Sequence, residues 1–313
     1  MGWQKGVEVE LSRENGGYSA VAYDTPRHQL LLLSDLPSAE LSTWSVPTPR
    51  SQPRRLSSVQ LQAGLWQQQP QILDSEGLVL NGDQVWVASE GRGRADRPAL
   101  LLRFSRRDGT LLQRVPFPDT WQAGERQGLQ SNAGPESLAR LSAGAARLEL
   151  LSAAERPLLQ DASNRVRLLR WWWPAGHDPN ADPPVPVEQG SLLMPEQPGW
   201  GLTDFVVLQE GVAGERAPFL LTLWRRFKEP LQWENQLRLY PLPRNGVTSQ
   251  ALMRWDLQAI GLTPENWEGI SLGPRMSAGQ PSIVLVSDDN LSSLQSSRLA
   301  VLVARQSPSC DQP

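Results

Sequence analysis

One pattern recurs five times along the chain, and it limits the fold more than any other feature. Each copy has a polar or acidic residue, a small or apolar pair, a turn, a β-rich strand and then charged residues. The copies begin about 60 residues apart, a spacing typical of repeat architectures. Their first residues are Ser19, Glu76, Glu136, Asp204 and Glu268.

Each interval between copies has room for two further strands. In the second copy, the strand at 84–89 is followed by 99–104 and 110–115, which flank the hairpin signal Asp108-Gly109. Four short antiparallel strands in about 60 residues are the length and pattern of a propeller blade. We therefore predict an all-β fold, a β-propeller of about five to six four-stranded antiparallel blades. The rival architecture, a pair of β-sandwiches, does not require the acidic residue to recur.

The limits of the ring are less well defined by the pattern. We expect one domain over 1–313, with a core of about 16–305 and a polar tail at 306–313. The repeat pattern starts abruptly near Gly16, so it does not decide how the ring closes. A sixth blade assembled from both termini is an alternative. We expect 178–198, rich in Pro and Asp, to be a loop between blades, and a short helical turn to start at 263–265.

Composition excludes several classes of function. The net charge of −3 and the absence of a basic stripe argue against nucleic-acid binding. No apolar run approaches the roughly 18 residues of a membrane span, and the first ten residues contain no signal-peptide core. The single cysteine excludes an intramolecular disulfide. We expect a monomer without an organic cofactor.

The recurring acids are the main candidate for chemistry. Inner strands of a propeller line its central channel, so residues repeated at their starts converge near the axis. Carboxylates without histidine or cysteine suit Ca²⁺ or Mg²⁺. The predicted metal ligands are Glu76, Glu136, Glu268, Asp288 and Asp289. The alternative is equally open: propellers also use repeated acids to bind backbone amides and tie neighbouring blades together.

Other catalytic signals are weak. The sequence has no Gly-x-Ser-x-Gly elbow, P-loop or dinucleotide fingerprint. Its two histidines, His28 and His177, fall in turn and loop segments, so we expect both at the surface. Arg92, Arg94 and Arg97 form a loop that we interpret as solvated, with phosphate binding as the alternative.

The acidic segments resemble the signatures of the phytase-like family, which is also named "esterase-like activity of phytase". The resemblance covers about 16–305, and the segments are Asp74-Ser75-Glu76-Gly77-Leu78 with Trp86–Gly91, Asn132–Leu138, Gly201–Phe205, and Asn266–Ile270 with Val286–Asn290. It implies a bacterial, often exported or periplasmic propeller with phosphoester hydrolase activity, whereas this chain shows no signal peptide.

Two functions follow as hypotheses. The first is a phosphoester hydrolase acting on a small phosphorylated or ester substrate, with divalent cations bound in the channel. Its catalytic candidates are Glu76, Glu136, Asp204, Glu268 and Arg225, with Arg92 as an alternative to Arg225. The second is a non-catalytic propeller that binds a ligand or protein on one rim, with the acids in structural roles.

Overall fold

The structure is a computed structural model of the 313-residue chain. It describes residues 2–11, 16–66, 69–91, 97–141, 148–209, 218–230, 232–276, 279–292 and 294–305. The predicted polar tail and the arginines Arg92 and Arg94 lie outside these residues.

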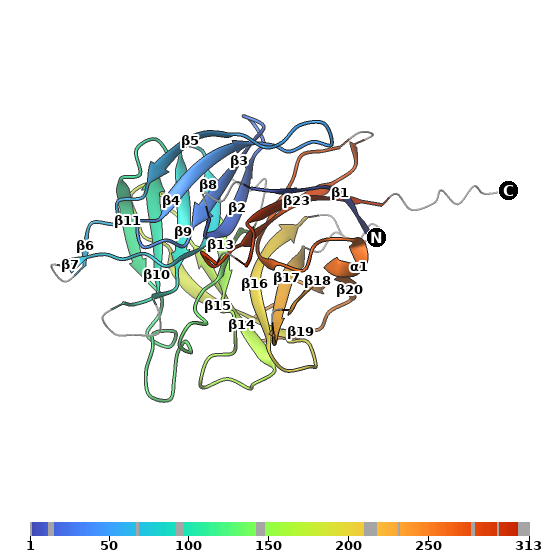
Figure 1. Cartoon of the computed structure of the whole chain (residues 1–313). Helices are drawn as coiled ribbons and strands as arrows, with labels where there is room; N and C mark the ends of the chain where they lie inside the picture. Colours follow the sequence, from blue (N-terminus) through green and yellow to red (C-terminus); the bar gives the residue numbers. More distant parts are fainter. Residues whose placement is uncertain are drawn as a thin grey trace.

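Five antiparallel sheets form the blades of a β-propeller (Figure 1). The first blade contains β2 (Tyr18–Asp24), β3 (Gln29–Ser34), β4 (Glu40–Ser45) and β5 (Arg55–Gln60). The second contains β8 (Ser75–Asn81), β9 (Gln84–Ser89), β10 (Leu100–Ser105) and β11 (Leu111–Pro116). A short hairpin of β6 (Leu65–Trp66) and β7 (Gln69–Pro70) lies between them in sequence.

The remaining blades follow the same order, with two additions. The third contains β12 (Ser137–Arg140), β13 (Glu149–Ala153), β14 (Arg165–Trp172) and β15 (Val185–Leu193), with β19 (Thr248–Ser249) added parallel to β15. The fourth contains β16 (Trp200–Leu208), β17 (Phe219–Lys228), β18 (Gln232–Pro241) and β20 (Met253–Asp256). The fifth contains β21 (Asn266–Leu272), β22 (Ser282–Asp288), β23 (Arg298–Ala304) and β1 (Trp3–Glu10).

The ring is closed by strands from both ends of the chain. The inner strands β2, β8, β12, β16 and β21 each contact the next, and β21 contacts β2. In the fifth blade β1 lies beside β23 (Figure 1), and their antiparallel pairing places Trp3 opposite Ala304. The prediction of a propeller is confirmed with five blades. Ring closure, which the abrupt start near Gly16 had left open, is achieved by β1 as the outer strand of the fifth blade, and the described residues form no sixth blade.

Two local predictions were wrong. The segment 178–198 is not only a loop, since it contains β15, the fourth strand of the third blade. The one helix among the described residues, α1 (Leu257–Ile260), precedes the predicted start at 263–265. The Asp256 side chain caps its first turn, and Gly261 ends it in the left-handed conformation. No helix among the described residues is long and apolar enough to cross a membrane.

Burial explains why the second strand of each blade has the clearest sequence signal. Strands β3, β9 and β22 are covered on both faces by neighbouring blades, so their apolar residues run almost without interruption. The outer strand β5 is mostly exposed and correspondingly polar. Each interface between consecutive blades holds one apolar cluster. Tryptophans are prominent in the cluster between the second and third blades, which contains Trp86, Trp121, Trp171 and Trp173.

Candidate functional site

A β-bulge at the start of the inner strand sets the direction of the repeated polar residue. Pairing with the second strand skips one residue in four blades: Ser19, Glu76, Thr203 and Glu268. In the third blade, Glu136 directly precedes β12. The extra residue of a bulge is unpaired, so its side chain is re-aimed. The structural equivalent of Glu76 in the fourth blade is therefore Thr203, one residue before the predicted Asp204.

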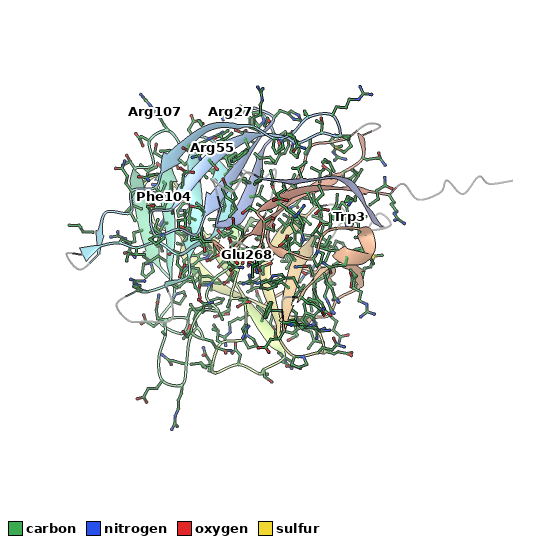
Figure 2. All side chains as sticks on the ribbon, in the orientation of Figure 1. Trp3, Arg27, Arg55, Phe104, Arg107 and Glu268 are labelled. Atoms are coloured by element: carbon green, nitrogen blue, oxygen red, sulfur yellow. The ribbon has the colours of Figure 1, made fainter. Side chains whose placement is uncertain are left out.

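The hydroxyl residues at this position tie blades together. Ser19 Oγ donates to the carbonyl oxygen of Ser75 at 2.5 Å. Thr203 Oγ1 lies 3.5 Å from the carbonyl oxygen of Trp267, the residue preceding the bulge of the next inner strand. The three glutamates at this position, Glu76, Glu136 and Glu268, are instead buried close to one another, each at no more than 9% exposure. Figure 2 shows Glu268 near the centre of the ring.

A second set of charged residues reaches the same end of the channel from the second strands of the blades or from the residues that follow those strands. These residues are Asp35, Glu90, Glu155, Arg225, Asp288 and Asp289. Three of them, Glu90, Glu155 and Asp289, pack against glycines of the next blade, where a Cβ would leave no space. A Cβ at Gly134 would lie 2.1 Å from Glu90 Cγ, and one at Gly201 would lie 2.1 Å from Glu155 Oε1. Glycine at these positions therefore lets each carboxylate lie between two blades.

Three carboxylates converge closely enough to share a cation. Ligand oxygens of Asp74, Glu76 and Glu90 all lie within 4.8 Å of one another. Glu76 and Glu90 come from sequence segments already singled out as acidic, but Asp74 was missed as a site residue. It lies two residues before the bulge, where other blades carry glycine or Asn266. The signal for Asp74 was therefore an acid at a position otherwise occupied by neutral residues.

Burial and mutual repulsion raise the proton affinity of these glutamates. The pKa of Glu76 is well above its usual value because of burial first, followed by repulsion from Glu136 and Glu268. Burial also raises the pKa of Glu136, with Glu155 as its strongest repelling neighbour. Such a cluster favours either bound protons or a bound cation.

Arg225 provides the positive charge in this cluster. Its guanidinium hydrogen-bonds Glu268 and lies 3.6 Å from Glu155 Oε1. It also donates to Asn266 Oδ1 at 2.5 Å, and Asn266 Nδ2 donates to Glu268 Oε1 at 2.8 Å. Burial alone would lower the pKa of Arg225, but the surrounding carboxylates outweigh it and raise that pKa above its usual value. Arg225 thus stays charged and links the third, fourth and fifth blades.

Two predicted site residues use their carboxylates on the backbone. Asp204 accepts hydrogen bonds from the backbone N–H groups of Phe205 at 2.8 Å and Ile270 at 2.9 Å. Asp289 Oδ1 accepts from the N–H groups of Gly17 and Leu291, both at 3.0 Å. These bonds connect the fourth blade to the fifth and the fifth to the first. They are the interactions expected of structural carboxylates.

Asp288 differs from its neighbour Asp289. It is 2% exposed, and its Oδ1 atom has no hydrogen-bond partner among the described residues. Burial first, and then repulsion from Glu268, raises its pKa to about 9. The pKa of Glu268 is raised to about 7 by burial, although Arg225 opposes the shift. A buried carboxylate oxygen without a partner is the kind of atom that a cation would satisfy.

These shifts predict a pH dependence for the cation-free protein. A carboxyl whose pKa is raised in the folded state stabilises the fold below its ordinary value, near pH 4. That stabilisation is lost as the pH rises through about 7 for Glu268 and about 9 for Asp288. We expect the free energy of unfolding, measured by denaturation in chelator, to fall by a few kcal/mol between pH 5.5 and pH 9. An unchanged or increasing free energy over this range would contradict the buried, protonated state of these groups.

The other end of the channel has a different character. Later residues of all five inner strands line a cavity of about 540 Å³, including Val21, Leu80, Leu138, Phe205 and Ile270. Its lining is largely apolar, with Arg140 and Arg275 among the few charged members. The two ends of the channel therefore differ in their lining, and the acidic cluster lies at the end where the inner strands begin.

The remaining candidates lie away from the acidic end or outside the described residues. His28 and His177 are both exposed, as predicted. Tyr23 and His28 share a hydrogen bond at the surface, with an O–N distance of 2.7 Å. The placement of Arg92, the predicted alternative to Arg225, is not described.

Comparison with known proteins agrees with this geometry. The family model for phytase-like proteins, described as the esterase-like activity of phytase, matches residues 13–291. The chain belongs to the phytase-like family. The matched range includes every acidic residue of the channel end, from Asp35 to Asp289. Membership in the phytase-like family supports a hydrolase at this coarse level.

Among solved structures, the chain is similar to the β-propeller domain of Cps50 (Swd1) from Myceliophteria thermophila. The two are 10% identical, the match covers 92% of this chain and 84% of that chain, and the TM-score is 0.40. No curated protein matches the sequence.

Proposed function

We propose that this phytase-like propeller is a divalent-cation-dependent hydrolase of phosphoric esters, acting at the acidic end of its channel. The observation that carries the proposal is the convergence of Asp74, Glu76 and Glu90, whose oxygens lie within 4.8 Å of one another. Carboxylates gathered in this way beside a charged arginine are typical of sites that bind a cation together with an anionic group.

The residues fit a hard cation. All the candidate donors are oxygens, which suits Ca²⁺ or Mg²⁺ better than zinc. Asp74, Glu76 and Glu90 would hold the ion, and Glu136 lies beside them. Asp288, with its unsatisfied Oδ1 atom, and Glu268 offer a second position. When bound, such an ion supplies Lewis-acid polarisation of a phosphoryl oxygen and lowers the pKa of its bound water.

The protein groups have separate roles in this proposal. Arg225, held by Glu155, Asn266 and Glu268, keeps its positive charge and would orient the phosphoryl oxygens. Glu136, whose pKa is raised by burial, is the candidate that would donate a proton to the leaving oxygen. Asp204 has no chemical role here, because its oxygens accept backbone hydrogen bonds.

A second function is favoured by a specific observation. Asp204, Asp289 and Glu90 all accept hydrogen bonds from backbone N–H groups, the last from Gly134 at 3.0 Å. Acids that connect blades in this way also suit a non-catalytic propeller that binds a ligand or protein on one rim. Such a protein would show no hydrolysis, and amide substitutions of its acids would affect stability alone.

The test is thermal unfolding of the chelator-treated protein with and without millimolar Ca²⁺, followed by hydrolysis assays with a chromogenic phosphomonoester. An ion at about 100 times its dissociation constant adds about 2.7 kcal/mol to stability, so a clear upward shift is expected. Mg²⁺ should shift the transition less. No shift with Ca²⁺, Mg²⁺ or Mn²⁺ would overturn the proposed cation site and favour the non-catalytic function.

A further inference from the structure

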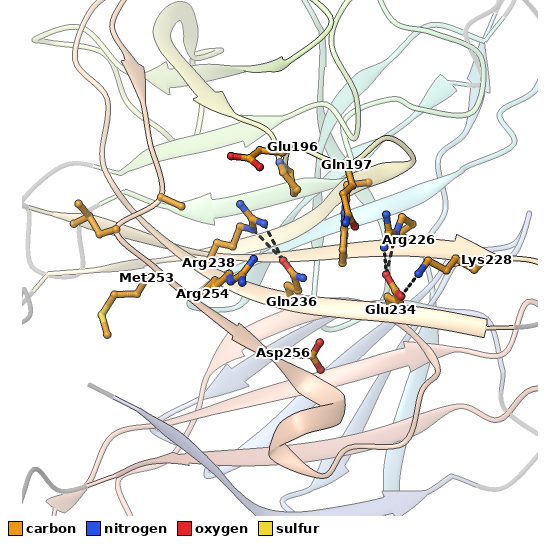
Figure 3. A pocket seen from close by; sticks show the side chains of 14 residues that line it. Glu196, Gln197, Arg226, Lys228, Glu234, Gln236, Arg238, Met253, Arg254 and Asp256 are labelled. Carbon is orange, nitrogen blue, oxygen red and sulfur yellow. Dashed lines mark hydrogen bonds and ion pairs between the residues drawn. The ribbon is translucent and has the colours of Figure 1, made fainter.

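A groove on the fourth blade lies outside the acidic end of the channel, and its lining has four cationic and three acidic side chains. It encloses about 750 Å³ between the sheet formed by β17, β18 and β20 and the segment from Pro195 to Trp200 (Figure 3). Four cationic side chains line it: Arg226, Lys228, Arg238 and Arg254. Its volume is within the range of about 300–1,000 Å³ typical of small-ligand sites.

The charges at one end of the groove are already paired. Arg226 hydrogen-bonds Glu234, and Lys228 Nζ lies 2.5 Å from Glu234 Oε1. The guanidinium of Arg226 also lies 4.9 Å from the ring centroid of Trp200, in a cation–π contact. This end is therefore electrostatically satisfied, although two cations share one carboxylate.

The other end holds two arginines in an unfavourable arrangement. Arg238 and Arg254 are directly opposite each other in the antiparallel pairing of β18 with β20, so their side chains leave the same face. Like charges opposite each other destabilise a sheet. The nearest hydrogen-bond partner of Arg238 is neutral: its guanidinium donates to the side-chain oxygen of Gln236 at 3.0 and 3.2 Å. Arg254 is exposed and makes no hydrogen bond or ion pair among the described residues.

The acids nearby do not neutralise this pair. Glu196, across the groove, forms no ion pair with either arginine in the described part of the chain, and Figure 3 shows none. Asp256 lies on β20 two residues from Arg254, but its Oδ1 atom caps α1 by accepting from Ala259 N at 3.0 Å. An anion between Arg238 and Arg254 would therefore accept charge-assisted hydrogen bonds from both guanidinium groups and offset their mutual repulsion.

The surroundings also suggest the rest of the ligand. Leu252, beside Arg254 in the groove lining, is 58% exposed, and Ala251 lines the groove next to it. We propose that this groove is a second ligand site that binds a small organic anion, with its phosphate or carboxylate between Arg238 and Arg254 and its apolar part against Leu252. This site is independent of hydrolysis at the channel end.

The test uses phenylphosphonate, which has a phosphate-like head but no ester to hydrolyse, and isothermal titration calorimetry. We expect binding of one molecule per chain, weakened at least tenfold in Arg254→Gln and in Arg238→Gln. Benzoate should compete for the same site, and inorganic phosphate should bind more weakly because it lacks the apolar part. Arg107→Gln, an exposed arginine on the second blade (Figure 2), is the matched control and should bind as the original chain does.

The melting temperature without ligand is a second readout, which shows whether a variant has kept its fold. Because Arg254→Gln removes one of two facing like charges, its melting temperature without ligand should equal or exceed that of the original chain. Phenylphosphonate should then stabilise the original chain and not the variant. The proposal is overturned if no saturable binding occurs or if both arginine variants bind as tightly as the control. Glu76→Gln should retain this binding, so failure of the proposed hydrolase activity would leave the result unaffected.

Discussion

Glu76→Gln is expected to reduce phosphoester hydrolysis by about 100-fold or more. The substitution keeps the shape of the side chain but removes one of three carboxylates that converge within 4.8 Å. Loss of groups that merely support metal ligands costs about 10–100-fold, so loss of a ligand should cost at least as much. Steady-state hydrolysis of a chromogenic phosphomonoester in Ca²⁺ measures the effect, and the thermal shift with Ca²⁺ should be reduced in parallel.

Asp204→Asn is the matched control for this experiment. It is also a buried acid-to-amide change on an inner strand, but its oxygens bind the N–H groups of Phe205 and Ile270. Replacing one oxygen by an NH₂ group leaves a buried donor unsatisfied, which should cost about 1–3 kcal/mol of stability. The variant should keep the Ca²⁺ shift. If Glu76→Gln retained full activity and the Ca²⁺ shift, its assignment as a ligand would be wrong.

Arg225→Met is expected to lower the free energy of unfolding by about 3–5 kcal/mol, the typical cost of leaving buried charges without their partner. Glu155 and Glu268 both lose a guanidinium whose side chain is only 16% exposed. Urea denaturation at pH 8 in chelator measures the loss. Ca²⁺ should recover part of it, because a cation can take over some of the compensating charge.

The control for Arg225 is an exposed arginine that also pairs with acids. Arg27→Met removes ion pairs to Asp24 and Asp83, with an arginine side chain that is 48% exposed (Figure 2). Surface pairs contribute about 0–1 kcal/mol, so its effect should be small. Equal losses in Arg225→Met and Arg27→Met would show that the charge of Arg225 is not what stabilises the channel end.

Much of the blade pattern could be predicted because it depends on local chemistry. The strand expected at 84–89 is β9 itself, and those expected at 99–104 and 110–115 differ from β10 and β11 by one residue at each end. Strands β9 and β10 are almost entirely buried, so most of their positions hold apolar side chains and the segments are easily recognised. By contrast, β15 has a mixed burial pattern and begins just after the Pro- and Asp-rich run, which obscured it.

The acidic site could be predicted only in part. The gathering of Glu76, Glu136 and Glu268 followed from the repeat, since equivalent positions of a closed ring face one axis. Asp74 was missed because it does not recur in the other blades. Asp204 was placed in the same set as Glu76, although the bulge falls on Thr203. A shift of one residue in a strand turns a side chain to the other face, and short polar motifs do not reveal it.

The sequence by itself determined the repeat, the propeller class and the acidic nature of one end of the channel. These properties follow from residue type and spacing, which the chain carries locally. Only the tertiary structure decided that β1 closes the fifth blade, that Arg225 lies among carboxylates of two other blades, and that Asp204 binds backbone amides. Each of these depends on contacts between residues far apart in sequence. The free energy of such contacts is gained only when the ring closes, so no local sequence pattern indicates these contacts.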